Sequence, residues 1–301
     1  MSWIVLLLLG AIWGASYLLI KIGGAEIPPF TFVEGRMLIA ALALFAVMAI
    51  RKERVPRTRR EWLALVAMGI FNGVIPYTAI TWGELHITSG LAAILTAAMP
   101  LFTVIIAHYW THDERLTPVK IFGIAIGFLG VAVLFLPDLR QGIQMEFWGE
   151  LAIVVAAASY GLATVIAHKY VTGVSPIVAP AIQLGSAAIW MLPLSLIFDN
   201  PFALRPSVAA VGSLLILALL GTAFAYILYY WLVEHTGATR TSLVTYLIPI
   251  TGIFWGASFL GEKIELESIL GLVLIIVGIG FVNRQPAPTR EHLAAAPVEA
   301  D

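Results

Sequence analysis

The chain has 301 residues, of which 60% are hydrophobic and 12% are charged. A soluble domain carries about 25% charged residues because its surface faces water, so this composition excludes an ordinary soluble protein and indicates a membrane protein. The net charge of −1 gives no indication of nucleic-acid binding, and the lack of cysteine excludes disulfides, thiolate metal sites and a cysteine nucleophile.

Ten apolar segments predict transmembrane helices, because about 20 helical residues are needed to cross the ~30 Å hydrocarbon core. They are 3–22, 30–50, 62–82, 89–110, 118–136, 147–168, 176–198, 208–231, 239–260 and 267–283. The first segment lacks a basic region before it and a small-residue cleavage site, so we expect a retained helix rather than a signal peptide. The connections are short, and residues 284–301 are predicted to be a disordered tail.

The connections differ in their content of lysine and arginine. With ten spans, the side that carries both termini holds twelve: Arg51, Lys52, Arg54, Arg57, Arg59, Arg60, Arg115, Lys120, Lys169, Arg240, Arg284 and Arg290. The opposite side holds four: Lys21, Arg140, Arg205 and Lys263. Because basic residues accumulate on the cytoplasmic side, this asymmetry predicts that both termini, including the tail, lie in the cytoplasm.

The second half of the chain repeats the first at an offset of 147 to 149 residues, as from Gly14 to Gly161 and from Pro100 to Pro249. Other equivalent pairs are Pro29 and Pro176, Tyr77 and Tyr226, Trp82 and Trp231, Glu114 and Glu262, Gly123 and Gly271, and Gly130 and Gly278. The predicted repeats are residues 1–137 and 147–283. Each contains five spans, an odd number, so the two repeats are expected to have inverted topology. This symmetry is typical of transporters that work by alternating access, with the site near the midplane between the repeats.

Prolines lie about halfway along the fourth and ninth predicted spans, at Pro100 and Pro249. Each removes a backbone donor and leaves a carbonyl one turn earlier without its helical partner. The duplicated position favours a hinge beside the substrate, with Met99 and the free carbonyls available to it. A packing kink is the alternative.

Aromatic and polar side chains inside the spans are the second set of candidate substrate-binding residues. They are Trp13, Tyr17, Tyr77, Tyr160, Gln183, Tyr226, Tyr246 and Trp255. A deep tyrosine or tryptophan needs a hydrogen-bond partner and therefore tends to face the bundle interior or a cavity. Such a cavity suits a small amphipathic solute; packing within the protein core is the alternative.

Ionisable residues bear on substrate charge and on coupling. Glu34 and Arg36 lie near the start of the second span, where they can neutralise each other. Alternatively, Arg36 attracts a substrate carboxylate, and its repeat partner Gln183 is also polar. No acid is predicted at the midplane, which favours a facilitative carrier or substrate exchange; Glu34, His108 and His168 are the possible coupling groups.

Glycines along the fifth and tenth spans are predicted to let helices approach closely. They are Gly123, Gly127, Gly130, Gly271, Gly278 and Gly280. We expect them to hold a monomer together, with a homodimer through these faces left open.

Several motifs together resemble the drug/metabolite transporter (DMT) superfamily. They are Trp13-Gly14, Pro28-Pro29 followed by Arg36, Pro100, Asp113-Glu114-Arg115-Leu116-Thr117, Gly123 and Gly130, and in the second half Pro249, Gly261-Glu262-Lys263, Gly271 and Gly278. Over residues 3–283 the chain is similar to EamA-type exporters of this superfamily, and within them to YddG-like amino-acid exporters. The resemblance implies export of amino acids or related metabolites across the bacterial inner (plasma) membrane.

The resemblance also implies a cavity lined by spans one, three, four, six, eight and nine. Glu114 and Glu262 match a motif at span edges and are interpreted as helix-end or loop-fixing residues. The related small multidrug transporters carry an essential glutamate in their first helix. This chain has no acid between Trp3 and Ile22, so their cation/proton antiport is not expected here.

We therefore expect a transporter that exports amino acids, with aromatic and other neutral ones favoured. The alternatives are a carrier of the same fold for another neutral or zwitterionic metabolite or drug and, more remotely, an intramembrane enzyme. An enzyme is disfavoured because neither Gly-x-Ser-x-Gly nor His-Glu-x-x-His occurs. The expected partners are a small-molecule substrate and membrane lipid; no catalytic residue, metal, cofactor or nucleic acid is expected.

Overall fold

The computed structural model describes residues 2–111, 115–171 and 173–283, and within them it is helical without strands. The first half contains α1 (Ser2–Gly24), α2 (Pro29–Ile50), α3 (Arg59–Met68), a π-helical segment η1 (Gly69–Val74), α4 (Ile75–Gly83), α5 (Ser89–Thr96), α6 (Met99–Trp110) and α7 (Pro118–Leu134). The second half contains α8 (Leu136–Gln141), α9 (Met145–Tyr170), α10 (Val178–Leu194), η2 (Ser195–Asp199), η3 (Pro201–Ala203), α11 (Val208–Ala218), a π-helical segment η4 (Leu219–Phe224), α12 (Ala225–Thr236), α13 (Ala238–Thr241), α14 (Val244–Leu260) and α15 (Leu266–Val282).

The lengths of these helices fit a membrane protein. Seven continuous helical stretches of the described chain are long and apolar enough to cross a bilayer, and α7, α14 and α15 are shorter apolar helices of 17 residues each. At 1.5 Å per residue, 17 residues extend roughly 26 Å. The prediction of an all-helical membrane protein is confirmed; the number of ten spans and their orientation remain predictions.

Helix starts follow the local sequence. Proline occupies the first position of α2 and α7, where a missing N–H leaves no hydrogen bond unmade. Four helices, α7 among them, begin after a threonine or serine whose hydroxyl accepts from a backbone N–H of the first turn: Thr58, Thr88, Thr117 and Ser207. The boundaries of the apolar segments are therefore set by residues that can be recognised in the sequence.

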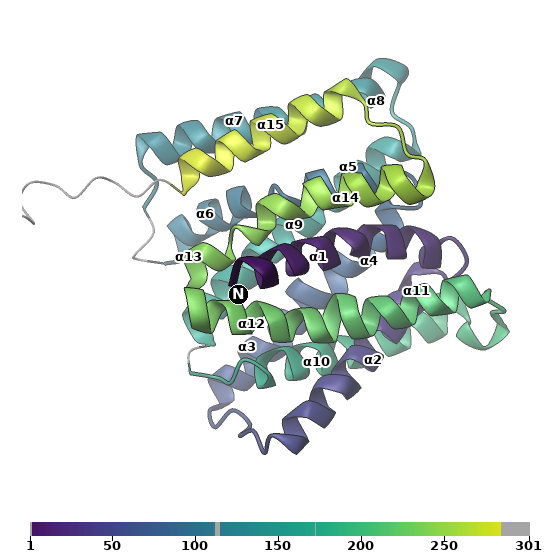
Figure 1. Ribbon diagram of the computed structural model, residues 1–301, viewed down its shortest axis with the longest axis vertical. Helices are drawn as coiled ribbons and strands as arrows, with labels where there is room; N and C mark the ends of the chain where they lie inside the picture. The colour runs from purple at the N-terminus through teal and green to yellow at the C-terminus, as the bar shows by residue number, and fades with distance from the viewer. Residues whose placement is uncertain (1, 112–114, 172, 284–301) are drawn as a thin grey trace, which may run out of the picture.

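The two halves pack against each other along equivalent helices (Figure 1). The pair α7 and α15 forms one side of the bundle and the pair α2 and α10 the opposite side, with the other helices between them. The described chain begins, at Ser2, and ends, at Asn283, at the same end of the bundle, called here the termini end. The opposite end, called the far end, carries the connections 25–28, 84–88, 199–207 and 261–265.

Two glycines at equivalent positions of the repeat make the same kind of contact between halves. A Cβ atom on Gly14 of α1 would lie 2.8 Å from the backbone nitrogen of Gly252 in α14. A Cβ atom on Gly161 of α9 would lie 2.9 Å from the backbone nitrogen of Thr103 in α6. Only glycine permits these approaches, so both helices that start a repeat pack backbone against backbone on the other repeat.

Glycines also bring α7 and α15 into contact. A Cβ on Gly123 would lie 2.6 Å from the carbonyl oxygen of Gly278, and a Cβ on Gly130 would lie 2.7 Å from that of Gly271. The expectation of close approach is wrong for Gly280, because, apart from the backbone of its own helix and its chain neighbours, no atom of the described chain lies within 4 Å of a Cβ placed there. Gly280 is on the face of α15 that points away from α7.

Substitution of Gly278 by alanine is expected to lower the free energy of unfolding by about 1–3 kcal/mol, because the added methyl group forces two backbones apart. Gly280→Ala on the same helix is the matched control. It meets open space, so we expect no loss, or a gain of up to about 1 kcal/mol from helix propensity. Thermal unfolding of both variants in detergent checks this pair, and equal destabilisation by the two substitutions would contradict the assigned contact.

Candidate functional site

A buried arginine lies at the centre of the bundle, between the two halves. Arg36 of α2 is 5% exposed, and its Nε donates a hydrogen bond of 2.9 Å to the hydroxyl of Thr222. Its guanidinium carbon lies 4.1 Å from the ring centroid of Tyr77, a cation–π contact. Thr222 belongs to the second half, so the arginine links the two repeats.

The predicted self-neutralising pair of Glu34 and Arg36 is wrong. No ion pair joins these two residues, both of which lie in the described chain, because side chains two positions apart on a helix do not face each other. Arg36 instead points into the bundle, while Glu34 is only half-buried. The alternative role, attraction of a substrate carboxylate, is the one compatible with this geometry.

The π-helical segments η1 and η4 supply polar groups to the same region. The Thr222 hydroxyl in η4 accepts from Arg36 and donates 2.9 Å to the carbonyl of Leu217, which the wider helical turn leaves available. In η1, the carbonyl of Phe71 accepts 2.7 Å from the Ser159 hydroxyl of α9. Such π-helical turns occur often at functional sites, and here η4 contacts the buried arginine through Thr222.

Tyrosines and amides complete this cluster. The Tyr226 hydroxyl accepts 3.1 Å from the Asn72 side-chain amide of η1 and lies 3.4 Å from the amide nitrogen of Gln183. The rings of Tyr77 and Tyr160 meet edge to face, with centroids 6.2 Å apart. We call the following set the central cluster: Arg36, Asn72, Tyr77, Tyr160, Gln183, Thr222 and Tyr226.

The central cluster brings together five of the predicted substrate-binding residues: Arg36, Tyr77, Tyr160, Gln183 and Tyr226. Tyr17 of α1 adjoins it and is buried, with its hydroxyl paired with the side chain of Thr96. The sequence analysis did not identify Asn72 and Thr222. Their only signal was their place in the third and eighth spans at nearly equivalent positions.

Three other predicted residues fix helices to one another. Trp13 lies against Tyr229, with ring centroids 5.6 Å apart. The Trp255 indole nitrogen donates 3.1 Å to the carbonyl of Ala11, which ties α14 to α1. The Tyr246 hydroxyl accepts 3.1 Å from Asn283 at the termini end.

The prolines do not form the symmetric hinge that the repeat suggested. The fourth span breaks at residues 97–98, so Pro100 is the second residue of α6, where its missing N–H is tolerated, and Met99 is the first. Pro249 lies inside the continuous helix α14, and the break in this span comes earlier, at residues 242–243. The two spans therefore bend at different depths.

The predicted coupling histidines lie away from the central cluster. The His108 ring nitrogen Nδ1 accepts 3.3 Å from the backbone N–H of Leu116 and so ties Leu116, just before α7, to the last turn of α6. His168 is exposed near the end of α9. Both lie at helix ends rather than within the bundle.

Carboxylates join the two halves at the far end. Glu262 accepts from the backbone N–H of Ser89 at 2.7 Å and from that of Gly90 at 3.1 Å, at the first turn of α5. Asp199 accepts 2.7 Å from the N–H of Thr31 at the start of α2. A negative charge at a helix N-terminus is stabilised by the helix dipole and by charge-assisted hydrogen bonds.

A third carboxylate, Glu26, makes the same kind of contact in the opposite direction. It accepts from the N–H and the hydroxyl of Ser207, at 2.7 Å and 2.6 Å, at the start of α11. These hydrogen bonds hold the pKa of Glu26 below its ordinary value.

The predicted helix-end role of Glu262 matches its observed contacts, whereas Glu114 lies outside the described residues. At the far end, contacts therefore run from each half to the other.

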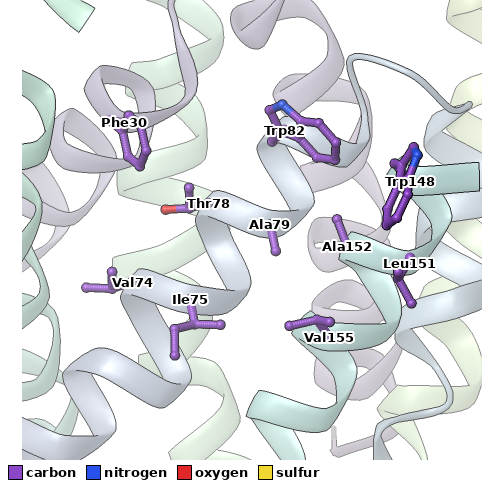
Figure 2. Close-up of a pocket in the computed structure, with 10 residues that line it drawn as sticks. All are labelled: Phe30, Val74, Ile75, Thr78, Ala79, Trp82, Trp148, Leu151, Ala152 and Val155. Atoms are coloured by element: carbon purple, nitrogen blue, oxygen red, sulfur yellow. The ribbon is translucent and has the colours of Figure 1, made fainter. Parts of the chain in front are cut away.

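A groove of about 510 Å³ lies apart from the central cluster, between α2, α4 and α9 (Figure 2). It is lined by Phe30, Val74, Ile75, Thr78, Ala79, Trp82, Trp148, Leu151, Ala152 and Val155. Apart from the Thr78 hydroxyl and two indole nitrogens, the lining is apolar. Figure 2 shows Trp82 and Trp148 toward one end of the groove and Val74, Ile75 and Val155 toward the other. The groove is open and lacks charge, so it suits lipid acyl chains better than a polar solute.

Sequence comparisons place the chain among transporters. The profile of the EamA-like transporter family matches twice, over residues 1–136 and 147–284. The uncharacterized transporter YoaV of Bacillus subtilis is 29% identical over 90% of this chain and 92% of its own length. The uncharacterized inner membrane transporter YedA of Escherichia coli K12 is 25% identical over 90% of this chain and 87% of its own.

One relative has a more specific description. A probable terminal-alkyne amino-acid exporter of Streptantibioticus cattleyicolor is 27% identical over 93% of this chain and 92% of its own length. Among solved structures, one crystal structure superposes with a TM-score of 0.66 at 16% identity, covering 94% of this chain and 96% of that one. At this level of identity the superposition supports the fold alone.

Proposed function

The chain belongs to the EamA-like transporter family of the DMT superfamily, and from this premise we propose that it exports amino acids from the cytoplasm by alternating access. It is a multi-pass protein of the inner (plasma) membrane, and its family and relatives are transporters rather than enzymes. To this we add the class of substrate, the direction of transport and the residues that bind the substrate.

The observation that carries the substrate class is the hydrogen bonding of Arg36. Only Nε has an acceptor, Thr222; within the described chain the two terminal nitrogens of the guanidinium have none. Arginine keeps its charge when buried, and an unpaired buried charge is costly. A substrate carboxylate would pair with both terminal nitrogens at once, as arginine binds carboxylates elsewhere.

The remainder of the central cluster favours an amino acid over other carboxylates. Tyr77, Tyr160 and Tyr226 present rings and hydroxyls beside Arg36, which suits an apolar or aromatic side chain. Sugar phosphates would call for several cationic groups, and Arg36 is the one arginine or lysine of the central cluster. The amino-acid exporter among the relatives supports the same class.

The direction of export rests on topology. We propose ten spans, two inverted repeats (1–137 and 147–283) and cytoplasmic termini, supported by the twelve basic residues on the termini side against four on the other. The far end then faces the outside, and the contacts of Glu26, Asp199 and Glu262 close it. Substrate would enter from the cytoplasmic side while the far end is closed and leave when these contacts open.

Uptake of labelled solutes into liposomes that contain the pure protein tests the substrate class. The panel contains Phe, Trp, Tyr, Met, Thr, Leu, Lys and Glu, and it pairs phenylalanine with phenethylamine, which has the same ring and amine but no carboxylate. We expect saturable exchange of phenylalanine and other neutral amino acids, with no uptake of phenethylamine. Equal uptake of the two compounds, or no uptake of any amino acid, would contradict the proposal and favour another neutral or zwitterionic metabolite or drug as substrate.

A further inference from the structure

Glu84, in the short connection between α4 and α5, is an acid that the proposed transport mechanism does not use. Its side chain is 1% exposed, and neither carboxyl oxygen has a hydrogen-bond partner within the described chain. The hydroxyl oxygen of Thr81, one helical turn earlier and equally buried, also has none. A carboxylate buried without partners is strongly disfavoured relative to the neutral acid.

Four charged or titratable groups face Glu84 from the elements around it: Lys21 and Tyr17 of α1, Arg36 of α2, and Glu262 after α14. Lys21 does not form an ion pair with the carboxyl group, although both residues are described. Its amine donates instead to the backbone carbonyls of Glu84 and Ile87, the latter at 2.8 Å. Lys21 therefore holds the connection in place and leaves the carboxyl group unpaired.

The balance of these effects favours the neutral acid in the closed structure. Burial raises the pKa of Glu84 well above its ordinary value; Lys21 opposes this rise, Glu262 adds to it and Arg36 opposes it. Glu84 lies in the same connection that leads to Ser89, the residue whose backbone and hydroxyl bind Glu262. Separation of α5 from Glu262 would therefore admit water beside Glu84 as well.

We propose that Glu84 is a proton-binding site linked to the far end of the carrier: it holds a proton while that end is closed and releases it to the outer water when that end opens. This inference rests on the proposed function for the opening of the far end. Proton binding and closure then favour each other reciprocally. Neither the proposed substrate site nor its coupling groups Glu34, His108 and His168 include this residue.

The sign of the pH effect follows from the linkage. Hydration of Glu84 in the open state would return its pKa to the ordinary range of a glutamate, whereas burial raises the pKa in the closed state. At pH values below the open-state pKa of Glu84, the proton stabilises the closed state to its full extent. This stabilisation declines as pH rises toward the raised pKa that Glu84 has in the closed state. Between the two pKa values, each pH unit shifts the equilibrium toward the open state by about tenfold.

Opening can be measured without transport, because the chain contains no cysteine. Ser89→Cys places one thiol at a site that is 0% exposed in the closed structure, beneath Glu262. The rate of its reaction with a membrane-impermeant maleimide is measured over a range of pH. Division by the rate for the unfolded variant at the same pH removes the titration of the thiol itself.

With Glu84 present, we expect the normalised rate to rise with pH by up to about tenfold per unit. With Glu84→Gln, which resembles the protonated acid, the rate is expected to stay at the low-pH value. Glu150→Gln is the matched control, because Glu150 of α9 is also buried at the far end, at 2% exposed, with one unpartnered oxygen. The charges that act on Glu150 are those of Asp138 and Glu265, whereas those that act on Glu84 are Lys21, Glu262 and Arg36. The Glu150→Gln variant should keep the pH dependence.

A pH dependence that persists in Glu84→Gln, or one that is absent with Glu84 present, would overturn the proposal. If the pH dependence were lost in Glu150→Gln and not in Glu84→Gln, the titrating group would be Glu150, and the proposal for Glu84 would be overturned as well. These outcomes do not depend on the substrate, because the measurement is the labelling of a thiol and not transport. The liposome panel above tests the amino-acid proposal separately.

Discussion

Replacement of Arg36 by methionine is expected to reduce the rate of amino-acid uptake roughly 100-fold or more at subsaturating substrate. Removal of one partner of a buried ion pair costs about 3–5 kcal/mol, and each 1.4 kcal/mol corresponds to about tenfold in affinity. Methionine fills a similar volume, so packing against the Tyr77 ring is kept while the charge, its cation–π attraction to Tyr77 and the donor to Thr222 are lost. The measurement is exchange of labelled phenylalanine in reconstituted liposomes.

Two further variants separate binding from folding. Arg36→Lys keeps the charge but loses the planar fork and the Nε donor, so we expect an intermediate loss of roughly tenfold. Arg205→Met removes an arginine that is exposed at the far end, and its uptake should equal that of the unchanged protein. Thermal unfolding and gel filtration confirm that each variant folds. Uptake by folded Arg36→Met within twofold of the unchanged protein would show that Arg36 does not bind the substrate.

The helices were largely predictable from the sequence because two local properties determine them. Apolar runs of the required length place the spans, and residues such as Pro29, Thr88 and Ser207 start them at the expected positions. The repeat was equally visible, because equivalent glycines and prolines recur at a nearly constant offset. Contacts such as those of Gly14 and Gly161 then show why these positions are glycine in both halves.

The site was predictable only in part, because its contacts cross between halves. Arg36 and Thr222 are 186 positions apart, and no local pattern relates them. The π-helical segments that place Asn72 and Thr222 also depend on tertiary partners, such as the Ser159 hydroxyl on the Phe71 carbonyl. The arginine and the tyrosines of the central cluster were candidates from the sequence, but the sequence paired Arg36 with Glu34, a contact that the structure does not contain between these two described residues.

Glu84 was missed for a different reason. It lies in a connection between two spans, where an acid is ordinarily hydrated and needs no explanation. It is buried because the connection is short, is held by Lys21 of α1 and lies next to the Glu262 contact of the other half. The sequence also does not show where Pro100 and Pro249 lie within their helices. Pro100 is in the first turn of α6 and Pro249 is inside α14, and a proline can be accommodated at either kind of position.

Alternating access requires the two halves to separate at the far end. Glu26 precedes α2 in the first half, and Ser207 starts α11 in the second; Ser207 is exposed, and their side chains are in direct contact. The double variant Glu26→Cys/Ser207→Cys therefore allows a short thiol-specific cross-linker to join the halves across this end. The chain has no cysteine of its own, so no other position reacts.

The decisive measurement is labelled amino-acid flux in liposomes before cross-linking, after it, and after cleavage of a reducible cross-linker. Each single-cysteine variant treated with the same reagent is the control for modification alone and for loss of the Glu26–Ser207 contact. We expect flux to fall to background in the cross-linked double variant and to return on reduction, while both single variants keep transporting. Undiminished flux through fully cross-linked protein would contradict alternating access between the two halves.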